Sequence, residues 1–164
     1  MILYFLRHAA AEDRAVGGED RDRRLSRDGE TQLRAAAAMW RRLNLRPDVV
    51  LTSPLPRAVR TAELLVEALE LAAAPIADER LAPGAGWSDF ARALASHPAD
   101  RRVLFVGHEP DLSAAIELLT GASSVRMRKA GLACLEFYGV PEPGGGEIAW
   151  LLDPDLYQTD GDGA

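Results

Sequence analysis

Three short apolar segments, each followed at once by polar side chains, restrict the folds available to this chain more than any other feature. They cover residues 2–6, 48–52 and 103–106. Uninterrupted apolar runs of this length are typical of strands that are buried on both faces of a sheet. Such strands occur in parallel sheets whose two faces are covered by helices. The chain is therefore expected to be an α/β protein.

The segments between these strands have the composition of helices. Ser26 is suited to cap an alanine-rich helix over about 27–43, and a second helix is expected over about 56–70. A short strand and a loop rich in proline and glycine lead to a third helix, with Ser88 as its expected N-cap and its end near Ala95. Strands that alternate with helices predict a three-layer sandwich, in which a mainly parallel sheet lies between helices on both faces.

The C-terminal third predicts two further strands, at about 131–139 and 147–152, joined by the hairpin-like connection PEPGGGE. This pair is expected to place an antiparallel strand near an edge of the sheet. The sequence shows no linker and no internal repeat that would divide the chain. Residues 1–157 are therefore expected to form a single domain, and residues 158–164 a flexible tail.

The composition narrows the class of protein. The formal net charge of −6 is opposite in sign to that of most nucleic-acid-binding proteins, so no nucleic-acid partner is expected. No apolar run approaches the roughly 18 residues of a membrane span, and no signal peptide is recognisable. The single cysteine, Cys134, is expected to be a buried packing residue, and the scattered histidines do not predict a metal site. We expect a cytoplasmic monomer that binds neither membranes nor a cofactor.

The residues that follow the three apolar strands carry the chemistry of a candidate site. Arg7 and His8 follow the first strand, Ser53 and then Arg57 follow the second, and His108 follows the third. In a parallel α/β sheet, ligands bind beyond the carboxyl ends of the strands, where these ends meet at one edge. Two arginines and two histidines are therefore expected to converge there, although they lie far apart in the sequence.

This set of side chains is suited to phosphoryl groups. Two guanidinium groups bind a dianionic phosphoryl group through forked hydrogen bonds and stabilise the charge of its transition state. A neutral imidazole between them is a nucleophile toward phosphorus, and the positive charge around it disfavours the imidazolium form. We expect His8 to be that nucleophile, with its other ring nitrogen held by a backbone carbonyl. His108 is expected to donate to a phosphoryl oxygen.

The same segments resemble the signatures of the histidine phosphatase superfamily, the phosphoglycerate-mutase-like group. LRHA resembles its Arg-His-Gly signature, TSPLPRAVRTAE its Ser-Pro-x-x-Arg-Ala-x-x-Thr segment, and VGHEPDL its Gly-His segment. The short length, RRLSRDG and VGHEPDLS are similar to the SixA-type phosphohistidine phosphatases. The resemblance implies a phosphoglycerate-mutase-like fold, with His8 as the residue that accepts the phosphoryl group. It implies Arg7, Arg57 and His108 as phosphate ligands.

Two further positions are compared with the family pattern. Arg23, or its neighbour Arg24, matches an additional arginine that the resemblance implies as a phosphate ligand. It lies in the charged segment 12–24, which is expected to be a surface loop that enters near His8. Ala9 stands where the family has a glycine, and a methyl group is accepted there if the backbone keeps a negative φ.

The sequence assigns no general acid. Larger members of the family place an acidic proton donor after the third strand, where this chain has ERLAPGAGWSD. Glu79 and Asp89 are candidates near that place, and Glu109, beside His108, is another. An alkoxide leaving group needs protonation, so a site without a well-placed acid favours the weaker phosphorus–nitrogen bond of phosphohistidine.

The segment between the second strand and the strand at 103 bears on the substrate in another way. It has only about fifty residues, most of them already assigned to helices, which leaves little for a lid over the site. The leading expectation is therefore a metal-independent phosphatase that forms a phosphohistidine intermediate and acts on phosphohistidine in a protein. Two alternatives stay open, a phosphomonoesterase for small phosphorylated metabolites and a non-catalytic module that binds phosphate.

Overall fold

A computed structural model describes residues 1–14, 18–98 and 101–157. The predicted tail, 158–164, and residues 15–17 of the charged segment lie outside the described residues. The centre of the molecule is a six-stranded sheet with the strand order β3-β2-β4-β1-β5-β6. Its strands are β1 (Ile2–Arg7), β2 (Val49–Thr52), β3 (Ile76–Ala77), β4 (Arg102–Gly107), β5 (Leu132–Glu136) and β6 (Glu147–Leu152).

The strand directions confirm a mainly parallel sheet with an antiparallel strand. Strands β3, β2, β4 and β1 pair in parallel, whereas β5 is antiparallel to both of its neighbours, β1 and β6. Arg7 at the end of β1 is in register with Gly107 of β4, and Thr52 of β2 is in register with Val106. The carboxyl ends of these three strands therefore lie at one level.

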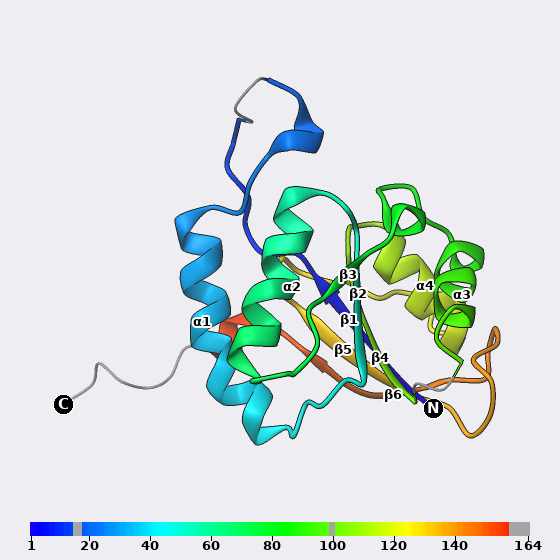
Figure 1. Ribbon diagram of the computed structural model, residues 1–164. Helices are drawn as coiled ribbons and strands as arrows, with labels where there is room; N and C mark the ends of the chain where they lie inside the picture. The colour runs from blue at the N-terminus through cyan, green and yellow to red at the C-terminus, as the bar shows by residue number, and fades with distance from the viewer. Residues whose placement is uncertain (15–17, 99–100, 158–164) are drawn as a thin grey trace.

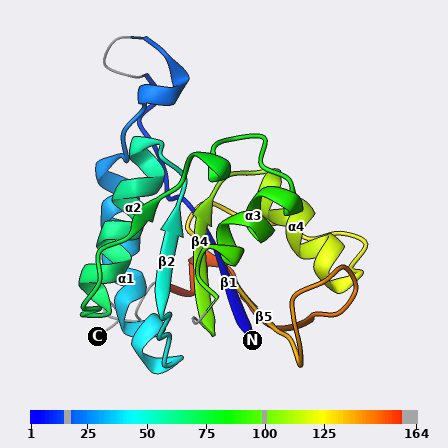
Figure 2. The same cartoon turned by 45° about the vertical axis from the view of Figure 1, so that its right-hand side comes forward.

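The helices lie on both faces of the sheet, which confirms the three-layer sandwich (Figures 1 and 2). Helices α1 and α2 cover one face, and α3 and α4 cover the other. The four helices are α1 (Arg27–Arg42), α2 (Pro56–Ala68), α3 (Trp87–Ala95) and α4 (Asp111–Thr120). Short 3₁₀ turns are η1 (Asp20–Asp22), η2 (Glu79–Leu81) and η3 (Pro154–Tyr157).

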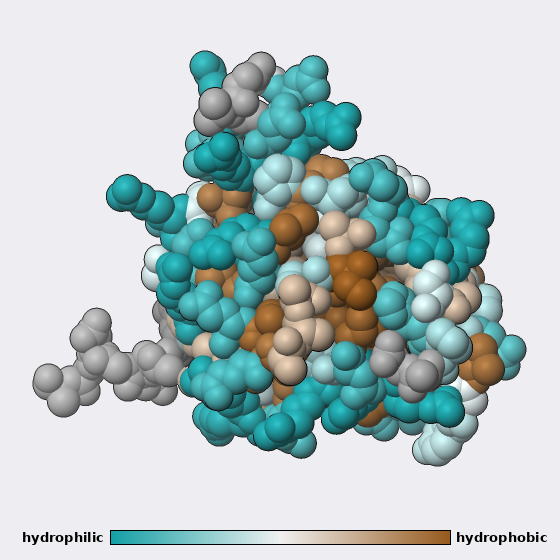
Figure 3. Space-filling model, in the orientation of Figure 1, coloured by the Kyte–Doolittle hydropathy of each residue, from teal (hydrophilic) through white to brown (hydrophobic). Residues whose placement is uncertain are grey.

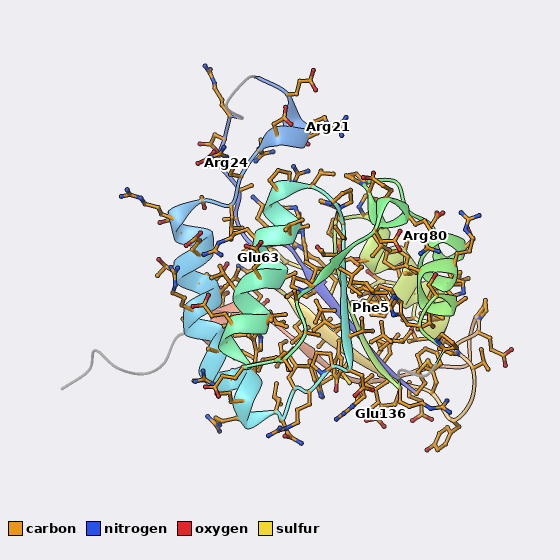
Figure 4. All side chains as sticks on the ribbon, viewed as in Figure 1. Phe5, Arg21, Arg24, Glu63, Arg80 and Glu136 are labelled. Atoms are coloured by element: carbon orange, nitrogen blue, oxygen red, sulfur yellow. The ribbon has the colours of Figure 1, made fainter. Side chains whose placement is uncertain are left out.

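Successive residues of each central strand enter different cores, which explains why the apolar runs do not alternate with polar residues. Leu3 and Phe5 of β1 belong to the core under α3 and α4, whereas Tyr4 and Leu6 belong to the core under α1 and α2. Phe5 lies at the middle of the sheet (Figure 4), and its ring stacks on that of Phe105 at 5.5 Å. Both faces of the sheet are covered by helices, so residues 2–6 of β1 are all apolar.

The start of α1 holds the segment that follows β1. Ser26 is the N-cap, as predicted, and its Oγ accepts a hydrogen bond from Gly29 N at 3.1 Å. The backbone N and the Oγ of Ser26 both donate to the carbonyl of Ala10, at 2.9 and 3.0 Å. A Cβ at Gly29 would lie 2.3 Å from the same carbonyl oxygen, so only glycine allows this close approach.

The predicted start of α3 is wrong. The helix begins at Trp87 with Gly86 as its N-cap, whereas Ser88 had been expected there. Gly86 N donates to the carboxylate of Asp89 at 2.9 Å, so the side chain at the third helical position satisfies the backbone N–H of the cap. Trp87 packs against the core on this face, so the first turn starts early enough to bring its ring inward.

The segment between β1 and α1 stands above the carboxyl ends of the strands, away from the body of the molecule (Figure 1). Arg21 and Arg24 both lie on this segment (Figure 4), and its surface is hydrophilic, in contrast to the apolar side chains gathered around β3 (Figure 3). In the described part of the chain, no helix has the length and apolar character that crossing a membrane requires. Cys134 is 3% exposed within β5, and burial raises its pKa to about 12, so it is a packing residue as predicted.

Candidate active site

The structure brings the two predicted histidines together at the carboxyl end of the sheet. Their ring centroids are 5.1 Å apart. Backbone hydrogen bonds continue the sheet just beyond its strands, from His8 N to Gly107 O at 3.1 Å and from Ser53 N to Val106 O at 2.9 Å. These bonds fix the relative positions of the residues that follow β1, β2 and β4. His8 and His108 are 8% and 4% exposed, so they form the floor of the site.

His8 is held in one tautomer. Its Nδ1 lies 2.7 Å from the carbonyl oxygen of Ala9, which only accepts, so Nδ1 carries the proton. The predicted backbone acceptor is thereby confirmed, and Nε2 keeps a free electron pair. Burial, and then the charges of His108, Arg57 and Arg7, lower the pKa of His8 to about 3, although the bond to Ala9 opposes the shift. The ring is therefore neutral at neutral pH.

His108 is fixed through the residue that follows β2. Its Nε2 lies 2.7 Å from Ser53 Oγ, and the same Oγ accepts from Leu55 N at 3.3 Å. This bond holds the imidazole of His108 in place, since a serine hydroxyl pairs with either tautomer of the ring. Burial and the charge of Arg57 lower the pKa of His108 to about 4. A second neutral imidazole thus accompanies His8.

Arg7 is anchored from the segment that precedes β5. Its Nη1 donates to Met127 O at 2.8 Å. Ala130 N donates to the carbonyls of Arg7 and His8, at 3.1 and 3.3 Å. Ala130 has a φ of 64°, in the left-handed region that a residue with a side chain rarely adopts, and Tyr157 Oη donates to its carbonyl at 2.8 Å. This strained backbone holds the C-terminal end of β1 in place.

Arg57 is the second residue of α2 and is 5% exposed. Its Nη1 donates to the carbonyl of Asp20 at 2.8 Å, and its Nη2 lies 3.2 Å from the Asp20 carboxylate. The other oxygen of that carboxylate pairs with Arg23 Nη1 at 2.8 Å. Hydrogen bonding to Arg23 and the charge of Arg57 hold the pKa of Asp20 below its usual range. The carboxylate of Asp20 thus bridges the guanidinium groups of Arg57 and Arg23.

The two candidates for the additional arginine have different positions. Arg23 is joined to Arg57 through Asp20, and its Nε donates to Glu12 O at 2.6 Å. Arg24 is exposed and points from the projecting segment (Figure 4). Arg23 is therefore the one that lies next to the predicted phosphate ligands.

Thr61 links two parts of the site, a role that sequence reasoning missed. Its Oγ1 accepts from Ala9 N at 3.3 Å and donates to Arg57 O at 2.8 Å. Among the described residues other than glycine, positive φ values occur at Asn44, Glu70 and Ala130, so the methyl group of Ala9 causes no backbone strain. Thr61 belongs to the TSPLPRAVRTAE segment, which was the available signal. Asp20 lies within a run of charges and had no signal of its own.

The three candidate acids differ in their surroundings. Glu79 is exposed in η2. Asp89 caps α3 and forms an ion pair with Arg92, and these contacts lower its pKa. Glu109 is half-buried beside His108, and burial raises its pKa. In the ranges that the structure describes, no group of three or more His, Cys, Asp or Glu side chains lies together as metal ligands do.

The chain is similar in sequence to known proteins. Residues 3–82 match the family model of the histidine phosphatase superfamily, branch 1. An uncharacterized protein from Picosynechococcus sp. is 39% identical over 137 residues, which cover 80% of this chain and 82% of the relative. The chain belongs to the histidine phosphatase superfamily. The match includes Arg7, His8 and Arg57, whereas His108 lies beyond the matched residues.

Solved structures of this superfamily have the same fold. A structure of the protein histidine phosphatase SixA complexed with tungstate superposes with a TM-score of 0.84 at 22% identity, covering 96% of this chain and all of the other. A putative phosphohistidine phosphatase SixA from Nakamurella multipartitia has a TM-score of 0.70 at 27% identity, covering 93% and 95% of the two chains. The phosphoglycerate-mutase-like fold that was expected is therefore present.

Proposed function

We propose that this histidine phosphatase hydrolyses phosphohistidine in a protein, through a phosphohistidine intermediate on His8. The observation that carries the phosphatase activity is the tautomer of His8. Its Nδ1–H is fixed on the carbonyl of Ala9 at 2.7 Å, so Nε2 presents an electron pair within a cationic site. A residue that only bound phosphate would need a proton at that nitrogen, because an acceptor repels an oxyanion.

The reaction has two displacements at phosphorus. In the first, the electron pair of His8 Nε2 forms a bond to phosphorus as the bond to the substrate nitrogen breaks, and the leaving imidazole takes a proton from solvent water. In the second, water attacks phosphorus, the bond to Nε2 breaks, and inorganic phosphate leaves as the proton of the water is released. Arg7 and Arg57 stabilise the equatorial oxygens in both steps, and a ring N–H of His108 donates to one of these oxygens.

The substrate class rests on the missing acid and on the open surface. Asp89 is committed to the cap of α3, and Glu79 is exposed. An imidazole leaves from phosphorus with less assistance than an alkoxide, so it suits a site without a dedicated proton donor. Helices α2 and α3, with β3 and η2, account for most of the chain between β2 and β4, which leaves few residues for a lid and favours a phosphorylated side chain on a protein surface as the substrate. The fold shared with SixA supports this choice.

The intermediate is tested by trapping. The protein is mixed with a histidine-phosphorylated protein labelled with ³²P and quenched in alkali within the first turnover. We expect label that is stable to alkali and labile to acid, at His8. His8→Ala should abolish both the labelling and the turnover, while retaining binding of tungstate. Full turnover by His8→Ala would overturn the proposed mechanism and favour a binding module or another nucleophile.

The substrate is tested by a panel that includes a phosphohistidine protein, phosphoserine and sugar phosphates, assayed with and without a chelator. We expect the highest kcat/KM for the phosphohistidine protein, and no effect of the chelator, because the guanidinium groups supply the positive charge. A preference of more than about tenfold for a small phosphomonoester would instead identify a metabolite phosphatase with the same site. The proposal includes a monomeric protein that acts on phosphoproteins in the cytoplasm.

A further inference from the structure

Two buried polar atoms beside the site have no hydrogen-bond partner within the described part of the chain. They are Nε of Arg7 and Oε1 of Glu109. One is a donor on a cation and the other an acceptor on a carboxyl group, so they are complementary. Buried polar groups without partners are destabilising, and folded proteins contain few of them. Neither atom is open to solvent, so an anion that enters the site does not reach them.

A chain of hydrogen bonds joins the same two residues by another route. Glu109 Oε2 accepts from Ser113 Oγ at 2.7 Å, and Ser113 Oγ accepts from Met127 N at 3.3 Å. Met127 is the residue whose carbonyl accepts from Arg7 Nη1 at 2.8 Å. Ser113 and Met127 are 7% and 1% exposed, so solvent does not compete for these bonds. Glu109 thus reaches the guanidinium of Arg7 through α4 and the segment before β5.

Arg7 and Glu109 also interact electrostatically. Burial lowers the pKa of Arg7, and the negative charge of Glu109 opposes that shift. Burial raises the pKa of Glu109, and both Ser113 and Arg7 oppose it. Each group therefore favours the charged form of the other. The bond from Arg7 Nη1 to Met127 O limits the rotation of the guanidinium and leaves its other Nη–H groups for phosphate.

We propose that Glu109 is a positioning residue for Arg7, which it orients through Ser113 and Met127 and by its own carboxylate. Glu109 thereby has a role other than that of a proton donor. If the guanidinium group of Arg7 is misaligned by a fraction of an ångström, it still attracts a dianion. It then fits the transition state less well. Loss of Glu109 should therefore lower kcat more than it raises KM. Only the kinetic part of this inference rests on the proposed function.

The kinetic test compares three substitutions. Glu109→Leu removes the acceptor at similar size and should lower kcat about tenfold or more, with KM within about threefold. Glu109→Gln keeps an acceptor for Ser113 and should retain kcat within about threefold. Glu117→Leu is the matched control, because Glu117 lies on α4 together with Ser113 and accepts from Val125 N at 2.7 Å. An equal loss in Glu117→Leu would mean that α4 has merely loosened, and would overturn the proposal.

Coupling to Arg7 is tested in a double-mutant cycle. In an Arg7→Lys background the guanidinium fork is absent, so Glu109→Leu should cause less than about a twofold further loss. Losses that multiply independently would show that Glu109 acts elsewhere, and would overturn the proposal.

A spectroscopic test does not depend on activity. Arg7 Nε–H is expected to give a protected resonance in ¹⁵N–¹H spectra, assigned by its absence in Arg7→Lys. Glu109→Leu and Ser113→Ala should both shift this resonance, whereas Glu117→Leu should leave it in place. An Arg7 Nε–H resonance that shifts in neither Glu109→Leu nor Ser113→Ala would overturn the inference, even if the proposed phosphatase activity holds. Ser113→Ala keeps the test available if Glu109→Leu does not fold.

Discussion

At the scale of single residues, burial of two imidazoles connects stability to pH. The pKa values of His8 and His108 are lowered from 6.5 to about 3 and about 4, first of all by burial. Between those values and 6.5 the unfolded chain binds protons that the folded chain does not. The free energy of unfolding therefore falls as the pH is lowered through this window.

The measurement compares urea unfolding of the wild type with that of His8→Gln/His108→Gln. From about pH 7.5 to about pH 5 the wild type should lose more stability than the double variant, whatever their absolute stabilities. Equal slopes in the two proteins would show that both rings titrate normally in the folded state.

A second prediction concerns the carboxylate that contacts the phosphate-binding arginines. Asp20 pairs with both Arg57 and Arg23, so an entering oxyanion competes with it. Asp20→Asn should tighten the binding of tungstate, measured by calorimetry, by up to about fivefold, the range expected for an exposed ion pair. Glu19→Gln removes the same charge from the neighbouring position and should have a smaller effect. Weaker binding by Asp20→Asn would mean that Asp20 orients Arg57 and does not compete with the anion.

Some site residues could be predicted from the sequence, because the carboxyl ends of parallel strands lie at the same edge of a sheet. Arg7 is the last residue of β1, and His8 and His108 directly follow β1 and β4, so their convergence follows from the topology. Thr61 lies within α2 and Glu109 just before α4, so their contacts depend on side-chain directions that the strand order does not determine. Their partners, Ala9 and Ser113, are set only by the packing of α2 and α4.

At the scale of secondary-structure elements, the junction between α1 and the segment after β1 leaves no room for a side chain at Gly29. Gly29→Ala would place a methyl group 2.3 Å from the carbonyl oxygen of Ala10, so the helix has to move. We expect a loss of about 1–3 kcal/mol in the free energy of unfolding, and a lower kcat, because Ala10 is two residues from His8.

The control for this substitution is Gly139→Ala. An added Cβ at Gly139 meets no atom within 4 Å, so the variant should keep wild-type stability and activity. Both variants are compared by urea unfolding. A Gly29→Ala protein as stable as Gly139→Ala would show that α1 is free to move away from Ala10.

The elements themselves were predicted where local signals agreed with packing. The predicted cap Ser26 is correct, because α1 can start there and still bury Leu33 and Trp40. The predicted cap Ser88 is wrong, because the core needs Trp87 within the first turn of α3. Cap chemistry alone does not distinguish neighbouring positions when a large side chain has to face inward.

At the scale of the whole molecule, both cores depend on the same strands. Leu3 packs under α3 and α4, while its neighbour Tyr4 packs under α1 and α2, and β4 contributes to both cores in the same manner. Unfolding of either helical layer would expose one face of β1 and β4 to water. Neither helical layer therefore has a core that is independent of the shared strands. We expect residues 1–157 to unfold in one cooperative transition.

Two tryptophans report on the two layers separately. Trp40 is fully buried in the core under α1 and α2, and Trp87 packs against the core on the opposite face. In single-tryptophan variants, Trp87→Phe/Trp150→Phe and Trp40→Phe/Trp150→Phe, the urea midpoint from fluorescence should coincide with the midpoint from far-UV circular dichroism. Each protein is its own reference, so a change in absolute stability does not affect the comparison. A fluorescence midpoint that precedes the loss of helix in either variant would mean that one layer detaches first, and that the sheet survives with a single covered face.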